Sequence, residues 1–191
     1  MTTAILTVGL AFIGYLATYL NGLRLAQRQA RLTRVNSQLS DFYGPLFALM
    51  EANGRTFDAF SEKYARPDGR DPFHHDVPPT DRELAEWRTW ATTVFIPNIR
   101  AMRDVVVGKA DLLIEEQMPQ VLLELCAHVS GYEITAARWA QGSYEDHLSF
   151  IPFPGRELRA YILDRFTRLK SEQADLLGRT AGAGRRREPA P

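Results

Sequence analysis

The feature that constrains this chain most is an uncharged stretch at its beginning, residues 2–23. These 22 residues contain no Asp, Glu, Lys or Arg, and most of them are apolar. As an α-helix the stretch would be about 33 Å long, which matches a bilayer hydrocarbon core of about 30 Å. A secretory signal peptide would carry basic residues before the apolar stretch and small residues at a cleavage site, and neither is present. A buried core helix would show a polar face. We therefore expect residues 1–23 to form a transmembrane anchor.

The charges that follow the stretch predict its orientation. Four arginines and no acidic residue lie within residues 24–40. Because positive charge is retained on the cytoplasmic side, we expect a single-pass protein of the cell inner membrane, with its N-terminus outside and its C-terminal domain in the cytoplasm. Aromatic and basic side chains at this boundary favour lipid headgroups. The residues expected at the membrane interface are Tyr19, Arg24, Arg28, Arg31 and Arg34.

Charge and cysteine content exclude a nucleic-acid partner, an intramolecular disulfide and a cysteine-based zinc site. Residues 41–178 hold 15 basic and 22 acidic side chains, a formal charge of −7. An acidic body repels phosphate backbones, so we expect no nucleic-acid partner. The single cysteine, Cys126, excludes an intramolecular disulfide and a cysteine-based zinc site.

Apolar residues recur every seven positions after the anchor, in two series. The first series holds Leu25, Leu32, Leu39 and Leu46, and the second holds Val35, Phe42 and Leu49. Arg28 occupies the position where the second series would begin. The pattern predicts a basic juxtamembrane helix over residues 24–43 that forms a homo-oligomer, as a coiled coil, through residues 25–42. The alternative is that the same seam packs against later helices of the same chain.

Helical periodicity continues through the rest of the chain, and no strand-like alternation is long enough to build a sheet. Gly44-Pro45 should interrupt the first helix, and Thr80 with Glu83 forms the sequence pattern of a capping box. Residues 143–153 should be extended. The expected helices cover 45–60, 80–108 with a kink or restart at Pro97, 110–117, 119–142 and 154–178. The fold class is therefore all-α: a transmembrane helix continuing into a cytoplasmic bundle of about five helices over residues 44–178, followed by a disordered tail, 179–191.

Several short motifs resemble a family of small bacterial membrane-anchored helical proteins. They are Phe42-Tyr43-Gly44-Pro45-Leu46, Val94-Phe95-Ile96-Pro97, Lys109-Ala110-Asp111-Leu112, Cys126-Ala127-His128-Val129 and Phe153-Pro154-Gly155. The similarity is scattered over residues 32–178. It implies a helical fold behind an N-terminal apolar segment, and it brings no catalytic residues with it.

One pair of residues could carry chemistry. Glu124 and His128 lie four residues apart on one predicted helix, the spacing at which a carboxylate orients an imidazole or both bind a metal ion. The simpler interpretation is a polar seam or a buried hydrogen bond between helices. Trp87, Trp90 and Phe95 are expected in the core, with an aromatic pocket as the alternative.

The sequence lacks the fingerprints of nucleotide-binding proteins and of hydrolases. No cofactor is expected. We expect a non-catalytic interaction or scaffolding protein that binds membrane lipids through its anchor and a protein partner through its helical domain. The alternative is a membrane-bound enzyme or metal-binding protein centred on Glu124 and His128.

Overall fold

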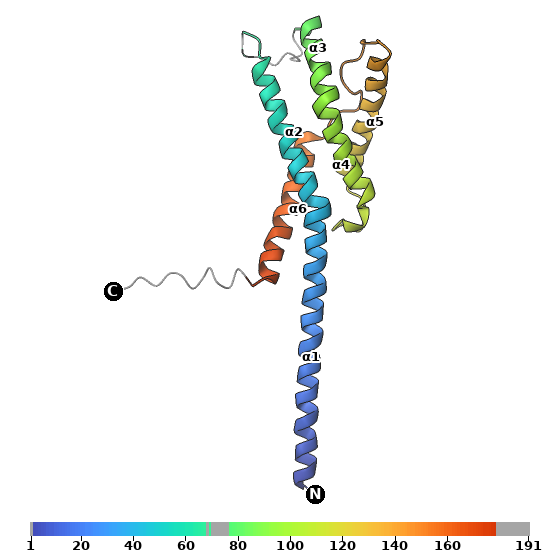
Figure 1. The fold of residues 1–191 in the computed structure, drawn as a ribbon. Helices are drawn as coiled ribbons and strands as arrows, with labels where there is room; N and C mark the ends of the chain where they lie inside the picture. Colours follow the sequence, from blue (N-terminus) through green and yellow to red (C-terminus); the bar gives the residue numbers. More distant parts are fainter. Residues whose placement is uncertain (1, 68, 70–76, 179–191) are drawn as a thin grey trace, which may run out of the picture. The chain divides into compact units, whose positions relative to one another are not determined.

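The computed structural model describes residues 2–67, 69 and 77–178, with the side chains described from residue 12 onward (Figure 1). These residues form helices and no strand, which confirms the all-α class. The elements are α1 (Thr2–Gln38), the π-helical turn η1 (Leu39–Tyr43), α2 (Gly44–Lys63), α3 (Asp81–Trp90), the π-helical turn η2 (Ala91–Phe95), α4 (Ile96–Gly108), the 3-10 turn η3 (Ala110–Leu112), α5 (Gln120–Ala140) and α6 (Gly155–Leu176). The predicted tail, 179–191, lies outside the described residues.

The chain divides into two compact units. Of the described residues, one unit contains 2–37 and 169–178. The other consists of Gln38–Arg168.

In the first unit, α1 and the C-terminal part of α6 run antiparallel and are joined by polar contacts. The Arg28 guanidinium donates to the carbonyl oxygen of Leu176 over 2.6 and 2.9 Å. Arg31 forms a two-point ion pair with Glu172 at 2.5 and 2.9 Å. Since Leu176 is the last residue of α6, Arg28 caps the negative end of that helix. This contact explains why an arginine interrupts the heptad pattern.

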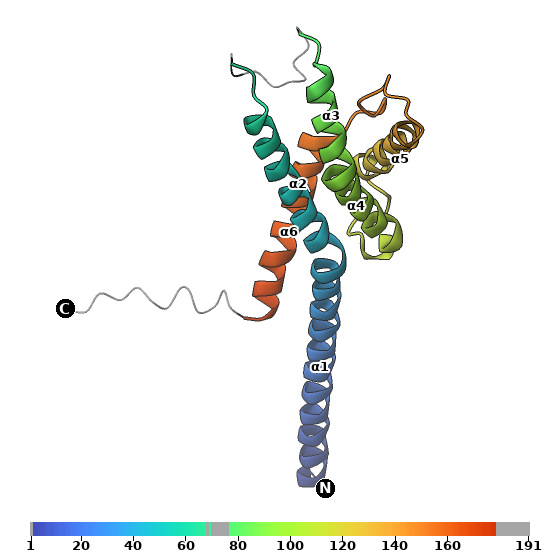
Figure 2. The ribbon, with the colours of Figure 1, turned by 45° about the horizontal axis from the view of Figure 1, so that its top comes forward.

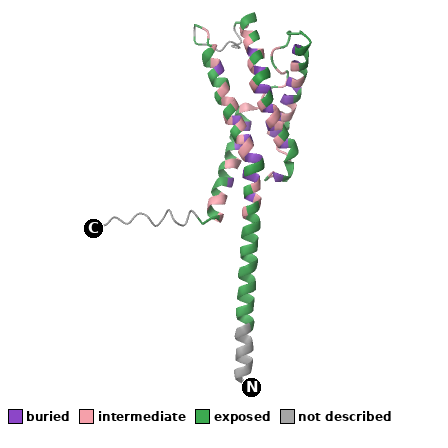
Figure 3. Cartoon of the chain, in the orientation of Figure 1, coloured by how far each residue is buried: buried purple, intermediate pink, exposed green. Residues whose placement is uncertain are grey.

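The side chains of residues 12–31, on α1, are exposed (Figure 3). Phe12 and Ile13 each expose 64% of their surface, and Leu25 exposes 62%. Among the helices of the described residues, we find none with an apolar stretch long enough to cross a membrane. The side chains of residues 2–11, which belong to the predicted anchor, lie outside the described residues.

The heptad seam is covered over only part of its length. Val35 and Phe42 are fully buried within a single chain, and Leu39 is 9% exposed, whereas Leu25 is open to its surroundings. A homo-oligomer through residues 25–42 stays a prediction. Of these seam residues, Leu25 is the one whose side chain is exposed enough to contact a second chain.

The predicted break at Gly44-Pro45 takes the form of a π-helical turn rather than a gap between two helices. Pro45 has no N–H to donate to the carbonyl four residues earlier, and its ring would collide with that carbonyl in a regular α-helix. Residues 39–43 therefore form a wider turn, in which the Gly44 N–H donates to Leu39 O, five residues earlier. A Cβ atom at Gly44 would lie 2.2 Å from this oxygen, so a side chain here would force the turn to shift.

The same solution recurs before the other helix-restarting proline. Residues 91–95 form a π-helical turn, the Ile96 N–H donates to Ala91 O, and Pro97 lies in the first turn of α4. The predicted restart at Pro97 is therefore confirmed. The capping box is also confirmed, because the Glu83 N–H donates to Thr80 Oγ1 and the Thr80 N–H donates to Glu83 Oε2.

The predicted helix over residues 110–117 is wrong. Only the short turn η3 forms, and Leu113 is already extended. Side chains satisfy the backbone groups that a helix would use: Gln38 Nε2 donates to Leu112 O, and the Ile114 N–H donates to Tyr43 Oη. Counting α3, η2 and α4 as one continuous helix, as in the prediction for residues 80–108, the described residues between 44 and 178 form four helical segments rather than about five.

The core of the second unit lies where α2, α4 and α5 pack side by side (Figure 2). The first half of α6 contributes Leu158 and Ile162, both fully buried. The other large, fully buried residues of this unit are Tyr43, Phe42, Phe60, Leu46, Ile96, Met102, Leu122 and Leu125. This packing positions the walls of the pocket described next.

Candidate functional site

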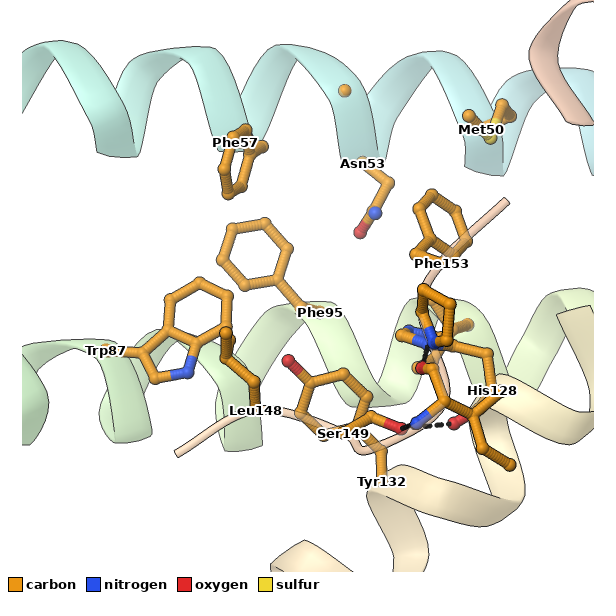
Figure 4. Close-up of a pocket in the computed structure, with 14 residues that line it drawn as sticks. Met50, Asn53, Phe57, Trp87, Phe95, His128, Tyr132, Leu148, Ser149 and Phe153 are labelled. Atoms are coloured by element: carbon orange, nitrogen blue, oxygen red, sulfur yellow. Dashed lines mark hydrogen bonds between the residues drawn. The ribbon is translucent and has the colours of Figure 1, made fainter. Parts of the chain in front are cut away.

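A pocket of about 380 Å³ opens in the second unit beside α2, η2–α4, α5 and the loop that joins α5 to α6 (Figure 4). Its walls are mainly aromatic and aliphatic. The lining residues are Met50, Asn53, Gly54, Phe57, Trp87, Phe95, Ile99, His128, Tyr132, Leu148, Ser149, Ile151, Pro152 and Phe153. The volume lies in the range of about 300–1,000 Å³ that is typical of small-molecule sites.

Three ring N–H groups hold the loop that forms one wall. Trp87 Nε1 donates to His147 O and Trp139 Nε1 donates to Asp146 O, each over 2.7 Å. His128 Nδ1 lies 2.6 Å from Ile151 O. Since α3 carries the first of these rings and α5 the other two, the loop is fixed to both helices. Residues 143–153 contain no helix, but they bend at residues 145, 148, 150 and 151, so the expectation that the whole segment is extended is wrong.

Ser149 and Gly131 bring the loop into direct contact with α5. Ser149 Oγ donates to His128 O over 3.4 Å and accepts from the Ile151 N–H over 3.2 Å (Figure 4). A Cβ atom at Gly131 would lie 2.2 Å from Ser149 Oγ. The loop can therefore come this close to α5 only because residue 131 has no side chain.

His128 is buried against aromatic rings, and it is neutral. It exposes 6% of its surface and lies between Tyr132 and Phe153, with ring centroids 5.0 and 5.1 Å away. Burial lowers the pKa of His128, and the hydrogen bond to Ile151 O offsets part of this effect. Because a carbonyl only accepts, Nδ1 carries the proton and Nε2 is left as an acceptor. Burial likewise raises the pKa of Tyr132 to about 12, so its hydroxyl stays protonated.

The opposite wall is aromatic. Trp87 and Phe95 stack with their ring centroids 5.4 Å apart, and Phe60 packs edge-on behind them, 5.5 Å from Trp87. Trp87 and Phe95 are 5% and 7% exposed, so they belong to the core and line the pocket at once. Phe57 is 40% exposed, which makes it the most open ring of this wall.

Glu124 and His128 do not act together in the described structure. Glu124 Oε1 accepts a hydrogen bond from Gln120 Nε2 over 3.2 Å, and Glu124 lines a different, more open hollow than the pocket that contains His128. Among the described residues, no three His, Cys, Asp or Glu side chains are grouped so that they could hold a metal ion. His74 and His75 lie outside the described residues.

The residues predicted at the membrane interface fall into two sets. Tyr19 is 54% exposed and stacks on Tyr15 with a centroid distance of 6.4 Å. Arg28 and Arg31 bind the end of α6, as described above. Their guanidinium groups are therefore already engaged within the chain.

The sequence contains one signal that points to the pocket and was missed: the interior glycine of α5, Gly131. Its neighbours on the helix, His128 and Tyr132, are two of the polar residues that line the pocket, beside Asn53 and Ser149. The arrangement offers mainly apolar walls with a few neutral polar groups, namely the His128 imidazole, the Tyr132 phenol, the Ser149 hydroxyl and the Asn53 amide, which suits binding of an apolar group. Comparison of the chain with protein-family models, with curated proteins and with solved structures finds no match.

Proposed function

We propose that this chain is a non-catalytic binding and scaffolding module, tethered to the cytoplasmic face of the inner membrane by residues 1–23. The apolar pocket around His128 receives an apolar group of a partner. The observation that carries the proposal is the chemistry of the pocket lining, in which the described side chains include aromatic and aliphatic groups and no carboxylate.

The lining favours binding over acid–base catalysis. A general base needs a proton to abstract and, in most sites, an oriented partner that stabilises its charged form. Here the Nδ1 of His128 is bound to Ile151 O, a neutral carbonyl, and burial among Tyr132 and Phe153 disfavours the imidazolium. An apolar group placed in the pocket would instead gain about 25 cal/mol for each Å² of apolar surface removed from water.

The tether rests on the sequence and on exposure. Residues 2–23 carry no charged side chain. In the described part of this stretch, Phe12, Ile13 and Leu16 expose 43–64% of their surface, and water would otherwise cover these apolar groups. Lipid is the environment that suits them, and the arginines from Arg24 onward set the cytoplasmic end.

The alternative function is an enzyme or metal-binding protein centred on Glu124 and His128. It requires the two side chains to act on one ligand, and in the structure they line separate hollows. Stoichiometric metal in protein purified from membranes, lost in His128→Gln, would establish this alternative in place of the binding module.

The test of the binding module is photolabelling of the full-length protein in membranes. A neutral long-chain alcohol carrying an alkyl diazirine is added, irradiated, and its adducts are mapped on peptides. The anchor peptide reports partition of the probe into lipid. We expect additional adducts on residues 148–153, which form the pocket wall.

A pair of matched variants identifies the pocket as the labelled site. Gly54 lines the pocket, and a Cβ atom there meets no other atom within 4 Å, so Gly54→Phe fills the space without a clash at the backbone. Ala59→Phe places the same ring on an exposed position of α2 outside the pocket. Labelling of residues 148–153 should fall in the first variant and persist in the second. Equal labelling in both would overturn the proposal.

The tether is tested separately by washing the membranes. Full-length protein should resist high salt and leave only with detergent, because apolar burial is not screened by ions. A cytoplasmic reporter fused to the C-terminus should be active, and a periplasmic reporter should be inactive. Release by salt alone would exclude the transmembrane anchor.

A further inference from the structure

A second hollow adjoins the apolar pocket and has a different chemistry. It measures about 380 Å³ and shares Met50 and Gly54 with the pocket. Since a Cβ atom at Gly54 would meet nothing within 4 Å, no side chain separates the two spaces at this residue. The remaining lining of the second hollow is almost entirely charged: Glu51, Arg55, Asp58, Arg156 and Arg159, with Gly155 beside them.

Only some of the charged side chains of this hollow form ion pairs with each other. Arg159 forms a two-point ion pair with Glu51, at 2.7 and 3.2 Å. Arg55 acts on Glu51 only at longer range, and in the described structure Arg156 has neither a hydrogen bond nor an ion pair. Asp58 is the other acidic group, and it acts on Arg159. Three guanidinium groups thus face two carboxylates, and two of the three are not held by an ion pair.

We infer that the two spaces form one site for a single-chain amphiphile with an anionic head, whose chain enters the apolar pocket and whose head lies between Arg55 and Arg156. This inference rests on the proposed function, because the chain occupies the same pocket. Guanidinium groups form two-point, charge-assisted hydrogen bonds with carboxylates and phosphates. The inner pocket supplies the apolar burial that such a chain requires.

A carboxylate and a phosphate monoester share this recognition chemistry, so both kinds of head are compared. The full-length protein is placed in nanodiscs of zwitterionic phosphatidylcholine. Three diazirine probes with the same chain are used: a fatty acid, a lysophosphatidic acid and the neutral alcohol. Adducts on residues 148–153 are divided by adducts on the anchor peptide, which corrects for partition into lipid.

We expect an anionic probe to label the pocket roughly tenfold more than the alcohol, the change that about 1.4 kcal/mol of charge-assisted binding produces. Stronger labelling by the fatty acid would indicate a carboxylate head, and stronger labelling by the lysophosphatidic acid would indicate a phosphate head. Either result supports the inference. In the double variant Arg55→Gln/Arg156→Gln, labelling of residues 148–153 by the anionic probe should fall to the level seen with the alcohol. Arg168→Gln, an exposed arginine of α6 outside the hollow, is the matched control and should leave labelling unchanged.

The outcomes separate the two proposals. Equal labelling by the acid, the phosphate and the alcohol in the unmodified protein would overturn the anionic head while the binding pocket stands. Labelling of the anchor alone by all three probes would overturn the pocket itself. Labelling that persists in the double variant would show that the arginines do not bind the head, and this also overturns the inference.

Discussion

The Nδ1 atom of His128 lies 2.6 Å from the carbonyl oxygen of Ile151, and this contact joins the middle of α5 to the loop that closes the pocket. From the sequence, a polar seam or a buried hydrogen bond is the simpler interpretation of this side chain, and an enzyme or metal site is the alternative. In the structure its ring positions a loop, fills the pocket wall between Tyr132 and Phe153, and keeps one free acceptor, Nε2. Its role in the described structure is therefore to build the site.

Replacing His128 by Leu should destabilise the protein by about 1–3 kcal/mol, because the partly buried carbonyl of Ile151 is left without its donor. His128→Asn retains an N–H donor at the same distance along the side chain and should recover part of this loss. Urea unfolding followed by tryptophan fluorescence measures both, since Trp87 and Trp139 lie beside the same loop. An Asn variant no more stable than the Leu variant would show that ring packing, rather than the hydrogen bond, holds the loop.

The same residue should make stability depend on pH below about 6.5. Burial lowers the pKa of His128 in the folded protein, so between the folded and unfolded pKa values the unfolded chain binds more protons. The contribution of the neutral ring is complete above the unfolded value and is lost as the pH falls toward the folded value. His128→Leu should abolish this slope. A slope that survives in the variant would assign it to another group.

Gly131→Ala should destabilise the protein although alanine is the better helix former. The added Cβ would lie 2.2 Å from Ser149 Oγ and 3.5 Å from Ile151, so either the loop or α5 must move. Overpacking of this kind costs about 1–3 kcal/mol. The control is Gly108→Ala, at the end of α4, where a Cβ atom meets nothing within 4 Å and a small gain is expected. Equal effects of the two substitutions would contradict the close approach.

The sequence predicted well what depends on short-range chemistry. Helical spacing predicted α2, α5 and α6, the Thr80–Glu83 pattern predicted the start of α3, and the two prolines predicted where helices restart. It did not predict that the restarts are π-helical turns, because a proline is also compatible with a kinked or a broken helix. The failed helix at residues 110–117 has a long-range cause, since Gln38 and Tyr43 bind its backbone from another helix.

The pocket was beyond reach of the sequence for a similar reason. Its loop is held by ring N–H groups of Trp87, Trp139 and His128 that bind backbone carbonyls, and a carbonyl is present at every residue. Nothing in the letters 143–153 shows which carbonyl each ring selects. Only Gly131 could have indicated the pocket from the sequence, because it is a glycine in the middle of an otherwise regular helix.

Glu83 should contribute to stability above about pH 4.5 and lose that contribution as the pH falls toward 2. The Arg66 guanidinium, 3.1 Å away, and the Thr80 N–H lower the pKa of Glu83 to about 2. The folded protein thus holds this carboxylate ionised where the unfolded chain protonates it. Glu83→Gln keeps a neutral capping side chain and should cost about 1 kcal/mol at pH 7, with the difference from wild type shrinking below pH 4.5. Urea unfolding at several pH values measures this, and a difference independent of pH would assign the effect to packing.

Gly44→Ala should distort the first π-helical turn. Its Cβ would lie 2.2 Å from Leu39 O, the oxygen that accepts the Gly44 N–H, so the turn must shift to accommodate the side chain. We expect a loss of about 1–3 kcal/mol. Adding Pro45→Ala supplies the missing N–H and allows a regular α-helix through this region, so it should recover stability in the Gly44→Ala background. No recovery in the double variant would show that tertiary packing, rather than Pro45, imposes the π-helical turn.

Two arginines after the predicted anchor should have different roles: Arg24 interacts with lipid, and Arg28 caps a helix. Arg28 donates twice to Leu176 O, at the end of α6, whereas Arg24 lies one turn closer to residue 23. Arg28→Gln removes a cation from the negative end of α6, so the amides of residues 170–178 should exchange hydrogen several-fold faster. Arg24→Gln should leave that exchange unchanged and reduce the preference of the full-length protein for anionic over zwitterionic vesicles, since each basic side chain near the surface contributes about 1 kcal/mol. Hydrogen exchange and vesicle flotation measure the two effects on the same preparations. Faster exchange at residues 170–178 in both variants would mean that the charge of the segment as a whole, and not the Arg28 contact, holds the end of α6.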